Sequence, residues 1–253
     1  MPLKFSPPLF EVDRLNFGRG GITVLKSVSF TILPGEYCAV IGPNGGGKTT
    51  LIRLLLGLER ASSGSIKLFG TPQHRFDAWS RIGYVPQRSA LLDSSFPATV
   101  REVVAMGRYS KRGLFGFETE EDANAIREAM ELMAVSDLQE RLIGNLSGGQ
   151  RQRVMIARAL ASNPDVLIVD EPNTGVDAQS QHRFYELLRQ LNRKQQVSIL
   201  FVTHDVGVIA EDVTKVLFVN QTLLASKHPH DFMQCDSISV LYGNPSHVVT
   251  HDH

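Results

Sequence analysis

The feature that most constrains the fold is a glycine-rich segment between an apolar run and a stretch of helical character. It consists of Gly42, Pro43, Asn44, Gly45, Gly46, Gly47, Lys48, Thr49 and Thr50. Glycines let the backbone turn so tightly that several N–H groups point at one anion, and the following helix adds its positive N-terminal end. Lys48 can then reach the β- and γ-phosphates of a nucleotide, and the Thr49 hydroxyl can bind Mg²⁺. We interpret the segment as a phosphate-binding loop, because the alternative, a glycine-rich turn with a solvated lysine, does not explain the strand before it and the helix after it.

Length and composition restrict the class of protein. The 253 residues suffice for one large domain or two closely joined ones. The 26 basic and 26 acidic side chains cancel, so we expect no nucleic-acid partner. The two cysteines provide no disulfide framework, and no apolar run approaches the roughly 18 residues of a membrane span. We therefore expect a polypeptide that is soluble by itself and suited to a reducing cytosol.

Hydrophobic periodicity predicts an α/β fold in three parts. Residues 7–32 alternate as paired antiparallel strands, whereas residues 88–161 are helical in character. Residues 166–169 are apolar at every position, as in a central parallel strand that is covered on both faces. We expect one main domain at residues 7–227, with an inserted helical subdomain at about 88–161, and a histidine-bearing C-terminal tail at 228–253.

Two adjacent carboxylates, Asp170 and Glu171, follow the apolar strand. Ligands of parallel sheets bind at this edge, where strands end. Asp170 is positioned to hold Mg²⁺ directly or through water, and Glu171 to polarise a water that attacks the γ-phosphate. An acidic turn at the end of a strand is the alternative, and the phosphate-binding loop elsewhere in the chain makes it the weaker one.

A second phosphate cradle is predicted before the helical stretch 151–160. It consists of Ser147, Gly148, Gly149 and Gln150. Ser147 can cap the helix, and the two glycines expose backbone N–H groups at its positive end. Two cradles about a hundred residues apart can serve one nucleotide if two chains face each other head to tail.

Together, these motifs resemble those of the nucleotide-binding subunit of an ATP-binding cassette transporter, from Phe10 to about Val219. The resemblance rests on residues 42–49, Gln87, residues 146–150, residues 166–171, Asp177 and His204, in this order. It implies a P-loop NTPase core with a mixed parallel sheet, an antiparallel β subdomain and an inserted helical subdomain. It also implies ATP hydrolysis with ATP and Mg²⁺ as ligands.

The resemblance assigns further roles to single residues. Phe17 matches an aromatic residue that stacks on adenine, and an ordinary core phenylalanine is the alternative. Gln87 matches a glutamine that contacts Mg²⁺ and senses the γ-phosphate. Asp177 matches a residue that crosses the dimer interface. His204 matches a histidine that holds the γ-phosphate and orients the hydrolytic water together with Glu171.

Two departures from the family pattern concern the same site. The family commonly has a small non-glycine residue where this chain has Gly46, so we expect a looser loop that keeps its ligands. Residues 173–177 replace a frequent Ser-Ala-Leu-Asp, which keeps Asp177 but changes the residues beside it.

The resemblance also implies partners and a location. Two copies, or this chain and a close homologue, would trap two ATP molecules, each between Lys48 of one chain and Ser147 of the other. Integral membrane permease subunits would move with this dimer at the cytoplasmic face of the membrane, where the chain would be peripheral. A substrate-binding protein would take part only indirectly.

The cargo is indicated by softer similarities. Residues 90–100, 103–109 and 173–177 resemble the corresponding regions of zinc- and manganese-type metal importers. We expect import of such a divalent metal ion. Import of an iron-siderophore, haem or another substrate remains an alternative, as do export of drugs or lipids and a soluble ATPase without a transport role.

The C-terminal tail is rich in histidine. His247, His251 and His253 lie close together, and imidazoles are ligands that suit Zn²⁺. Zinc binding by these residues is one interpretation, and solvated terminal histidines are the other.

Overall fold

The chain forms two compact units. The computed structural model describes residues 7–87, 96–112, 116–171, 178–203 and 213–227. One unit comprises residues 1–76 and 200–253, and the other comprises residues 77–199. Within the described ranges, no helix is sufficiently long and apolar to cross a membrane. The domain limits expected from the sequence, with an insertion at about 88–161, stay a prediction.

The first unit contains an antiparallel sheet, with strand order β2-β1-β4-β5. The unit's elements are β1 (Phe10–Arg19), β2 (Ile22–Ile32), β3 (Tyr37–Ile41), α1 (Lys48–Leu55), β4 (Ser63–Leu68), β5 (Thr71–Pro72), the 3₁₀-helix η1 (Gln73–Arg75), most of β8 (Ser198–Val202), β9 (Lys215–Asn220) and β10 (Thr222–Lys227). Strand β1 buries Phe10, Val12 and Leu15. Its register with β2 shifts at three places, and the first, between Val12 and Leu15, includes Arg14 with a φ of 45°. The predicted pairing of residues 7–32 is confirmed.

The first unit also contains the start of a parallel sheet, with strand order β10-β9-β3-β8. Strand β3 is buried at all five residues and pairs in parallel with β9, from Cys38 opposite Lys215 to Ile41 opposite Phe218. The N–H of Thr203, directly after β8, donates to the Val40 carbonyl at 3.1 Å. A strand that is apolar on both faces lies in the interior of such a sheet, and its C-terminal end therefore leads directly into a ligand-binding edge.

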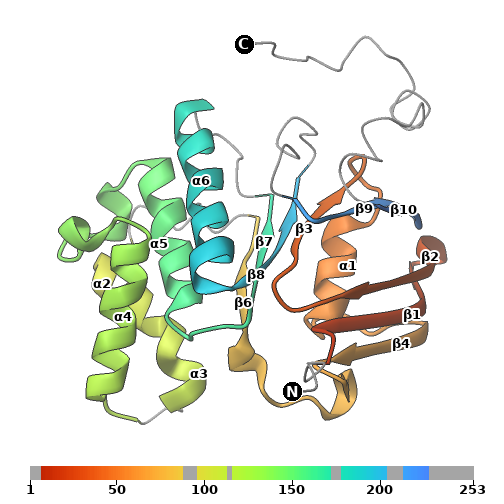
Figure 1. Ribbon diagram of the computed structural model, residues 1–253, viewed down its shortest axis with the longest axis horizontal. Helices are drawn as coiled ribbons and strands as arrows, with labels where there is room; N and C mark the ends of the chain where they lie inside the picture. Colours follow the sequence, from red (N-terminus) through yellow and green to blue (C-terminus); the bar gives the residue numbers. More distant parts are fainter. Residues whose placement is uncertain (1–6, 88–95, 113–115, 172–177, 204–212, 228–253) are drawn as a thin grey trace, which may run out of the picture. The chain divides into compact units, whose positions relative to one another are not determined.

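Helix α1 begins seven residues after β3 and packs in the same unit (Figure 1). It buries Leu51, Ile52, Leu54 and Leu55. The helix ends where Gly57 adopts a φ of 68°, and the Leu58 N–H donates to the Arg53 carbonyl at 2.9 Å. This is the left-handed glycine termination of a helix, as the sequence predicted near Gly57.

The second unit is mainly helical. Its elements are the 3₁₀-helices η2 (Trp79–Arg81), η4 (Met106–Arg108), η5 (Ser136–Leu138) and η6 (Ile143–Asn145), the strands β6 (Ile82–Val85) and β7 (Val166–Asp170), and the helices α2 (Val100–Ala105), α3 (Tyr109–Arg112), α4 (Glu120–Leu132), α5 (Gly148–Leu160) and α6 (Ala178–Gln195). Strands β6 and β7 pair in parallel, and all five residues of β7 are buried. The apolar run at 166–169 therefore forms the predicted covered strand.

Three helices of this unit begin with a reciprocal capping box, in which side chain and backbone of two residues bond each other. The pairs are Thr99 with Glu102 at α2, Thr119 with Asp122 at α4, and Ser147 with Gln150 at α5. Helices α2, α4 and α5 pack on one another (Figure 1). The start of each helix is thus fixed by its own local sequence, and packing of the apolar faces adds to that.

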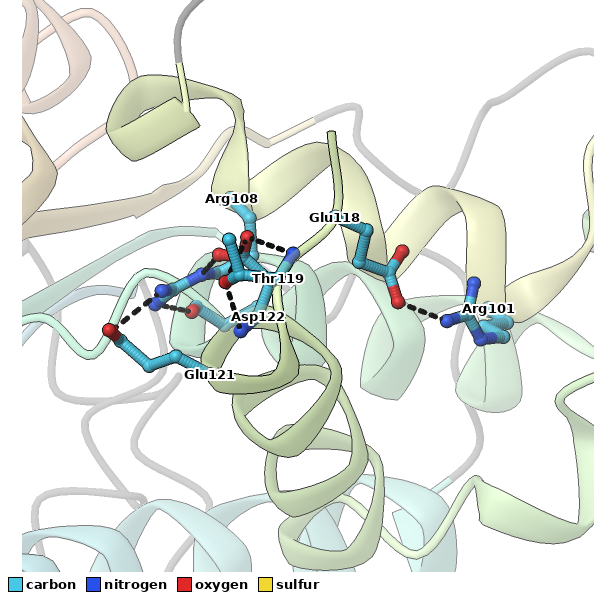
Figure 2. A network of polar contacts seen from close by, with 7 residues as sticks. Arg101, Arg108, Glu118, Thr119, Glu121 and Asp122 are labelled. Atoms are coloured by element: carbon cyan, nitrogen blue, oxygen red, sulfur yellow. Dashed lines mark hydrogen bonds and ion pairs between the residues drawn. The ribbon is translucent and has the colours of Figure 1, made fainter. Parts of the chain in front are cut away.

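A buried arginine joins three of these elements (Figure 2). The Arg108 Nε donates to Asp122 Oδ1 at 2.6 Å, Nη1 to the Ala161 carbonyl at 3.1 Å, and Nη2 to Glu121 Oε1 at 3.0 Å. Arg108 and Asp122 are each 2% exposed. The guanidinium therefore links η4 to the N-terminus of α4 and to the residue that follows α5.

Candidate functional site

The phosphate-binding loop and its lysine lie in the first unit. Lys48 is 4% exposed, and its Nζ donates to the carbonyls of Gly42 at 2.9 Å and Pro43 at 3.2 Å. The Gly46 N–H donates back to the Pro43 carbonyl at 3.1 Å. The loop thus wraps around the ammonium group of its own lysine, which fixes the positive charge inside the turn.

The loop is seated closely on the strands beside it. A Cβ at Gly42 would lie 2.0 Å from the Val219 carbonyl oxygen, and one at Gly46 would lie 2.8 Å from the same atom. The Gln221 N–H also donates to the Gly46 carbonyl at 2.9 Å. The expectation that Gly46 loosens the loop is therefore wrong: glycine is what allows this close approach between the loop and the β9–β10 turn.

This end of α1 fits a phosphate group. Among the described residues no side chain caps the helix, and its first turn contains no acidic residue. A Cβ at Gly45 would meet no described atom within 4 Å, so the outer side of the loop is open. Backbone N–H groups, the helix dipole and the Lys48 charge all favour an anion here. The Thr49 hydroxyl, on the first turn of the helix, is of the type that binds Mg²⁺ beside such a phosphate.

The two carboxylates and Gln87 lie in the second unit. Asp170 is the last residue of β7 and is 1% exposed. Glu171 follows with a φ of 42°, in the left-handed region that residues other than glycine rarely adopt. The Gln87 Nε2 donates to Glu171 Oε2 at 2.6 Å, although the two residues are 84 positions apart. The structure therefore brings two of the predicted catalytic residues into direct contact.

The second cradle begins helix α5. Ser147 is exposed and its Oγ accepts from the Gln150 N–H at 3.3 Å, while the Gln150 side chain accepts from the Ser147 N–H at 2.9 Å. A Cβ at Gly148 would meet no described atom within 4 Å. The predicted helix cap is confirmed, and the N-terminus of α5 presents an open backbone at the position expected for a phosphate.

Two contributors to these loops were missed by the sequence reasoning. Arg151 Nη1 donates to the Leu146 carbonyl at 2.7 Å and so holds the segment before α5. The β9–β10 turn, Val219 to Gln221, packs against Gly42 and Gly46 of the phosphate-binding loop. Its polar pair Asn220-Gln221 between two apolar strands was a turn signal, but nothing in it pointed to residues 42–46.

Phe17 lies in β1 of the first unit and is 7% exposed. Its strand neighbour is Leu25 on β2, and the guanidinium carbon of Arg19 lies 5.9 Å from its ring centroid. The ring is therefore part of the sheet's packing, and a role toward adenine stays a prediction.

Several predicted residues lie outside the described part of the chain. These are Asp177, His204, His247, His251 and His253. Their assignments stay predictions.

Known proteins match most of the chain. The family model described as "ABC transporter" matches residues 25–174. The zinc uptake system ATP-binding protein ZurA of Listeria innocua is 42% identical over 224 residues, which are 88% of this chain and 87% of the relative. The manganese transport system ATP-binding protein MntB of Bacillus subtilis is 35% identical over 233 residues, 92% of each chain.

A solved structure gives the same result for the fold. The structure of cbiO1 from Clostridium perfringens, part of the ABC transporter complex cbiONQ, is similar with a TM-score of 0.81 and 25% identity. The match covers 95% of this chain and 96% of that one. It supports the α/β fold of a P-loop NTPase that the sequence motifs implied. Because motifs, fold and relatives agree, this chain belongs to the ABC transporter family, as one of its ATP-hydrolysing cassettes.

Proposed function

We propose that the chain powers the import of a divalent metal ion such as zinc or manganese by hydrolysing ATP. Support for the cargo comes from the relatives, since both ZurA and MntB are named for metal transport and cover most of this chain. Support for the chemistry comes from one observation above all, the hydrogen bond from Gln87 to Glu171 at the end of β7.

In the proposed reaction Glu171 acts as the general base. A carboxylate oxygen accepts a proton from water as the water oxygen bonds to the γ-phosphorus and the bond from that phosphorus to the β–γ bridging oxygen breaks. ADP and inorganic phosphate are the products. The Gln87 amide donates to Oε2 and so orients the carboxylate before the water arrives. Lys48, on the loop that fits phosphate, would bind the transferred group, and His204 would hold it from another side.

Mg²⁺ would be held by Thr49, Asp170 and Gln87 in this proposal. They carry a hydroxyl, a carboxylate and an amide, which offer the oxygen ligands that this ion accepts. The ion would neutralise charge on the phosphates when bound. Phe17, residues 42–50, residues 147–150 and Asp177 would complete the contacts to ATP.

ABC cassettes dimerise and associate with membrane permease subunits. For this chain we propose a dimer with a second copy or a close homologue, in which the two separate phosphate cradles at α1 and α5 would serve the same nucleotide. The chain would then lie at the cytoplasmic face of the membrane, bound to a permease and only indirectly to a substrate-binding protein.

The proposal is tested with Glu171→Gln in cells that depend on this transporter. The amide keeps the shape of the side chain but cannot accept the proton, so we expect ATP turnover to fall about 10²–10⁴-fold and zinc or manganese accumulation to stop. Glu140→Gln, at an exposed carboxylate of the same unit, is the control and should leave both unchanged. Unchanged metal accumulation together with lost ATPase activity would refute the proposed metal import, whereas the assignment of ATP hydrolysis to Glu171 would stand.

Zinc binding by the tail is a separate proposal. It is supported only by the ligand types of His247, His251 and His253. Titration of Zn²⁺ into the chain and into a variant with alanine at these positions measures it: equal stoichiometry in both would rule the tail site out.

A further inference from the structure

A cation covers the aromatic ring that is assigned to the base of the nucleotide. The guanidinium carbon of Arg19 lies 5.9 Å from the Phe17 ring centroid, over its face. Arg19 follows Phe17 by two positions on β1, at the end of the strand. Phe17 is 7% exposed in this arrangement, in which both the packing of the sheet and the guanidinium surround it.

The guanidinium is held where it is by a carboxylate from another segment. Arg19 Nη2 lies 2.5 Å from Glu59 Oε1, and the same oxygen lies 3.5 Å from Arg53 Nε on α1. The Glu59 side chain is 21% exposed, whereas that of Arg19 is 65% exposed. Glu59 is therefore the more buried member of this ion pair and has a second cationic partner, whereas Arg19 is the more exposed member.

A guanidinium and an adenine ring compete for the same kind of surface. Both are flat, and both bind the face of an aromatic side chain, the first by a cation–π contact and the second by stacking. They cannot occupy one face of Phe17 at the same time.

We propose that Arg19 is a competitor built into the chain: it covers Phe17 until the base of ATP displaces it, and Glu59 sets how firmly it does so. This inference rests on the proposed function, because it takes Phe17 as the residue that receives the base. Arg19 thereby weakens binding of the base without touching the phosphates. A ligand must supply both a triphosphate and a base that stacks better than the guanidinium.

The test compares ATP with inorganic tripolyphosphate, which carries the phosphates and no base. Dissociation constants of both ligands are measured by titration calorimetry on the full chain and on Arg19→Ala. Removal of the competitor should raise the ratio of tripolyphosphate Kd to ATP Kd about two- to five-fold, the equivalent of one exposed cation–π contact. Glu59→Gln loosens Arg19 and should change the ratio in the same direction by less.

Two controls separate this effect from charge and from a failure of the site. Lys67→Ala removes one exposed positive charge, paired with Glu11, from the same unit and should leave the ratio unchanged. In a Phe17→Leu background Arg19→Ala should have no effect on the ratio, because the ring that both groups need is gone.

An unchanged or lower ratio of tripolyphosphate Kd to ATP Kd in Arg19→Ala would overturn the inference. A lower ratio would show that Arg19 helps to bind the base of ATP. Failure of the wild-type chain to bind either ligand would instead contradict the proposed nucleotide site itself.

Discussion

At the scale of single residues, the phosphate-binding loop depends on atoms that belong to distant positions. Gly46 is enclosed by the carbonyl oxygens of Val219 and Pro43, which would lie 2.8 and 3.0 Å from an added Cβ. Contacts below 3.0 Å to a backbone oxygen require the backbone itself to move. The local motif allows several residue types at position 46, but the β9–β10 turn restricts this position to glycine in the present chain.

We expect Gly46→Ala to destabilise the chain by about 1–3 kcal/mol, the usual cost of adding a methyl group to a filled site. Urea denaturation of both proteins measures the difference in the free energy of unfolding. Gly148→Ala serves as the control, because its Cβ would point into open space at the first position of α5. Equal stability of wild type and Gly46→Ala would show that the loop yields easily.

At the scale of elements, the hydrogen bonds of Arg108 connect η4 to α4 and to the residue after α5 in the helical unit (Figure 2). Hydrogen bonds from the Thr119 backbone and then from Arg108 lower the pKa of Asp122 far below its ordinary value of 3.8. Desolvation acts in the opposite direction and is outweighed. Asp122 thus serves two elements at once, since one oxygen caps α4 and the other accepts from Arg108 of η4.

The lowered pKa predicts how stability depends on pH. A carboxyl whose pKa is lower in the folded state stabilises the fold above its unfolded pKa, and this contribution is lost as the pH falls toward the folded pKa. We expect the free energy of unfolding of the wild type to fall below about pH 4, and to fall less steeply in Asp122→Asn, which is less stable at neutral pH. Urea denaturation between pH 7 and pH 3 measures both slopes. Asp137→Asn, at an exposed position of η5, should retain the wild-type slope; an Asp122→Asn slope that is equally steep would refute the role of this carboxyl.

At the scale of the whole molecule, the chain carries two helix N-termini suited to phosphate, at α1 in one unit and at α5 in the other. In the proposed dimer each ATP contacts α1 of one copy and α5 of the other. Hydrolysis would remove the γ-phosphate that both copies bind in this proposed dimer, and the dimer would then reopen.

The dimer is tested with the variant Glu171→Gln, which lacks the proposed general base. Glu171→Gln with ATP should elute from a sizing column as a dimer, because the bound γ-phosphate is not removed, whereas without nucleotide it should elute as a monomer. Adding Ser147→Arg to the variant places a bulky side chain at the start of α5 and should abolish the ATP-dependent dimer. A dimer that forms equally well with both changes would contradict the exchange of α5 between copies.

The sequence alone determined what depends on neighbours along the chain. The phosphate-binding loop, the capping box of Ser147 and Gln150, the covered strand β7 and the glycine end of α1 all follow from short patterns, because their hydrogen bonds and periodicities lie within a few residues. The family, and with it the ATPase chemistry, followed from the order of such motifs.

Only the tertiary structure decided what depends on contacts between distant segments. It placed Gln87 on Glu171 across 84 positions, enclosed Gly46 against Val219, and joined Arg19 to Glu59 across 40 positions. No local pattern encodes these pairs, because each exists only after the strands have paired and set the distance between its members. The local motifs therefore identified the ATPase, and the fold determined how closely its phosphate-binding loop is enclosed and which side chains from distant positions meet.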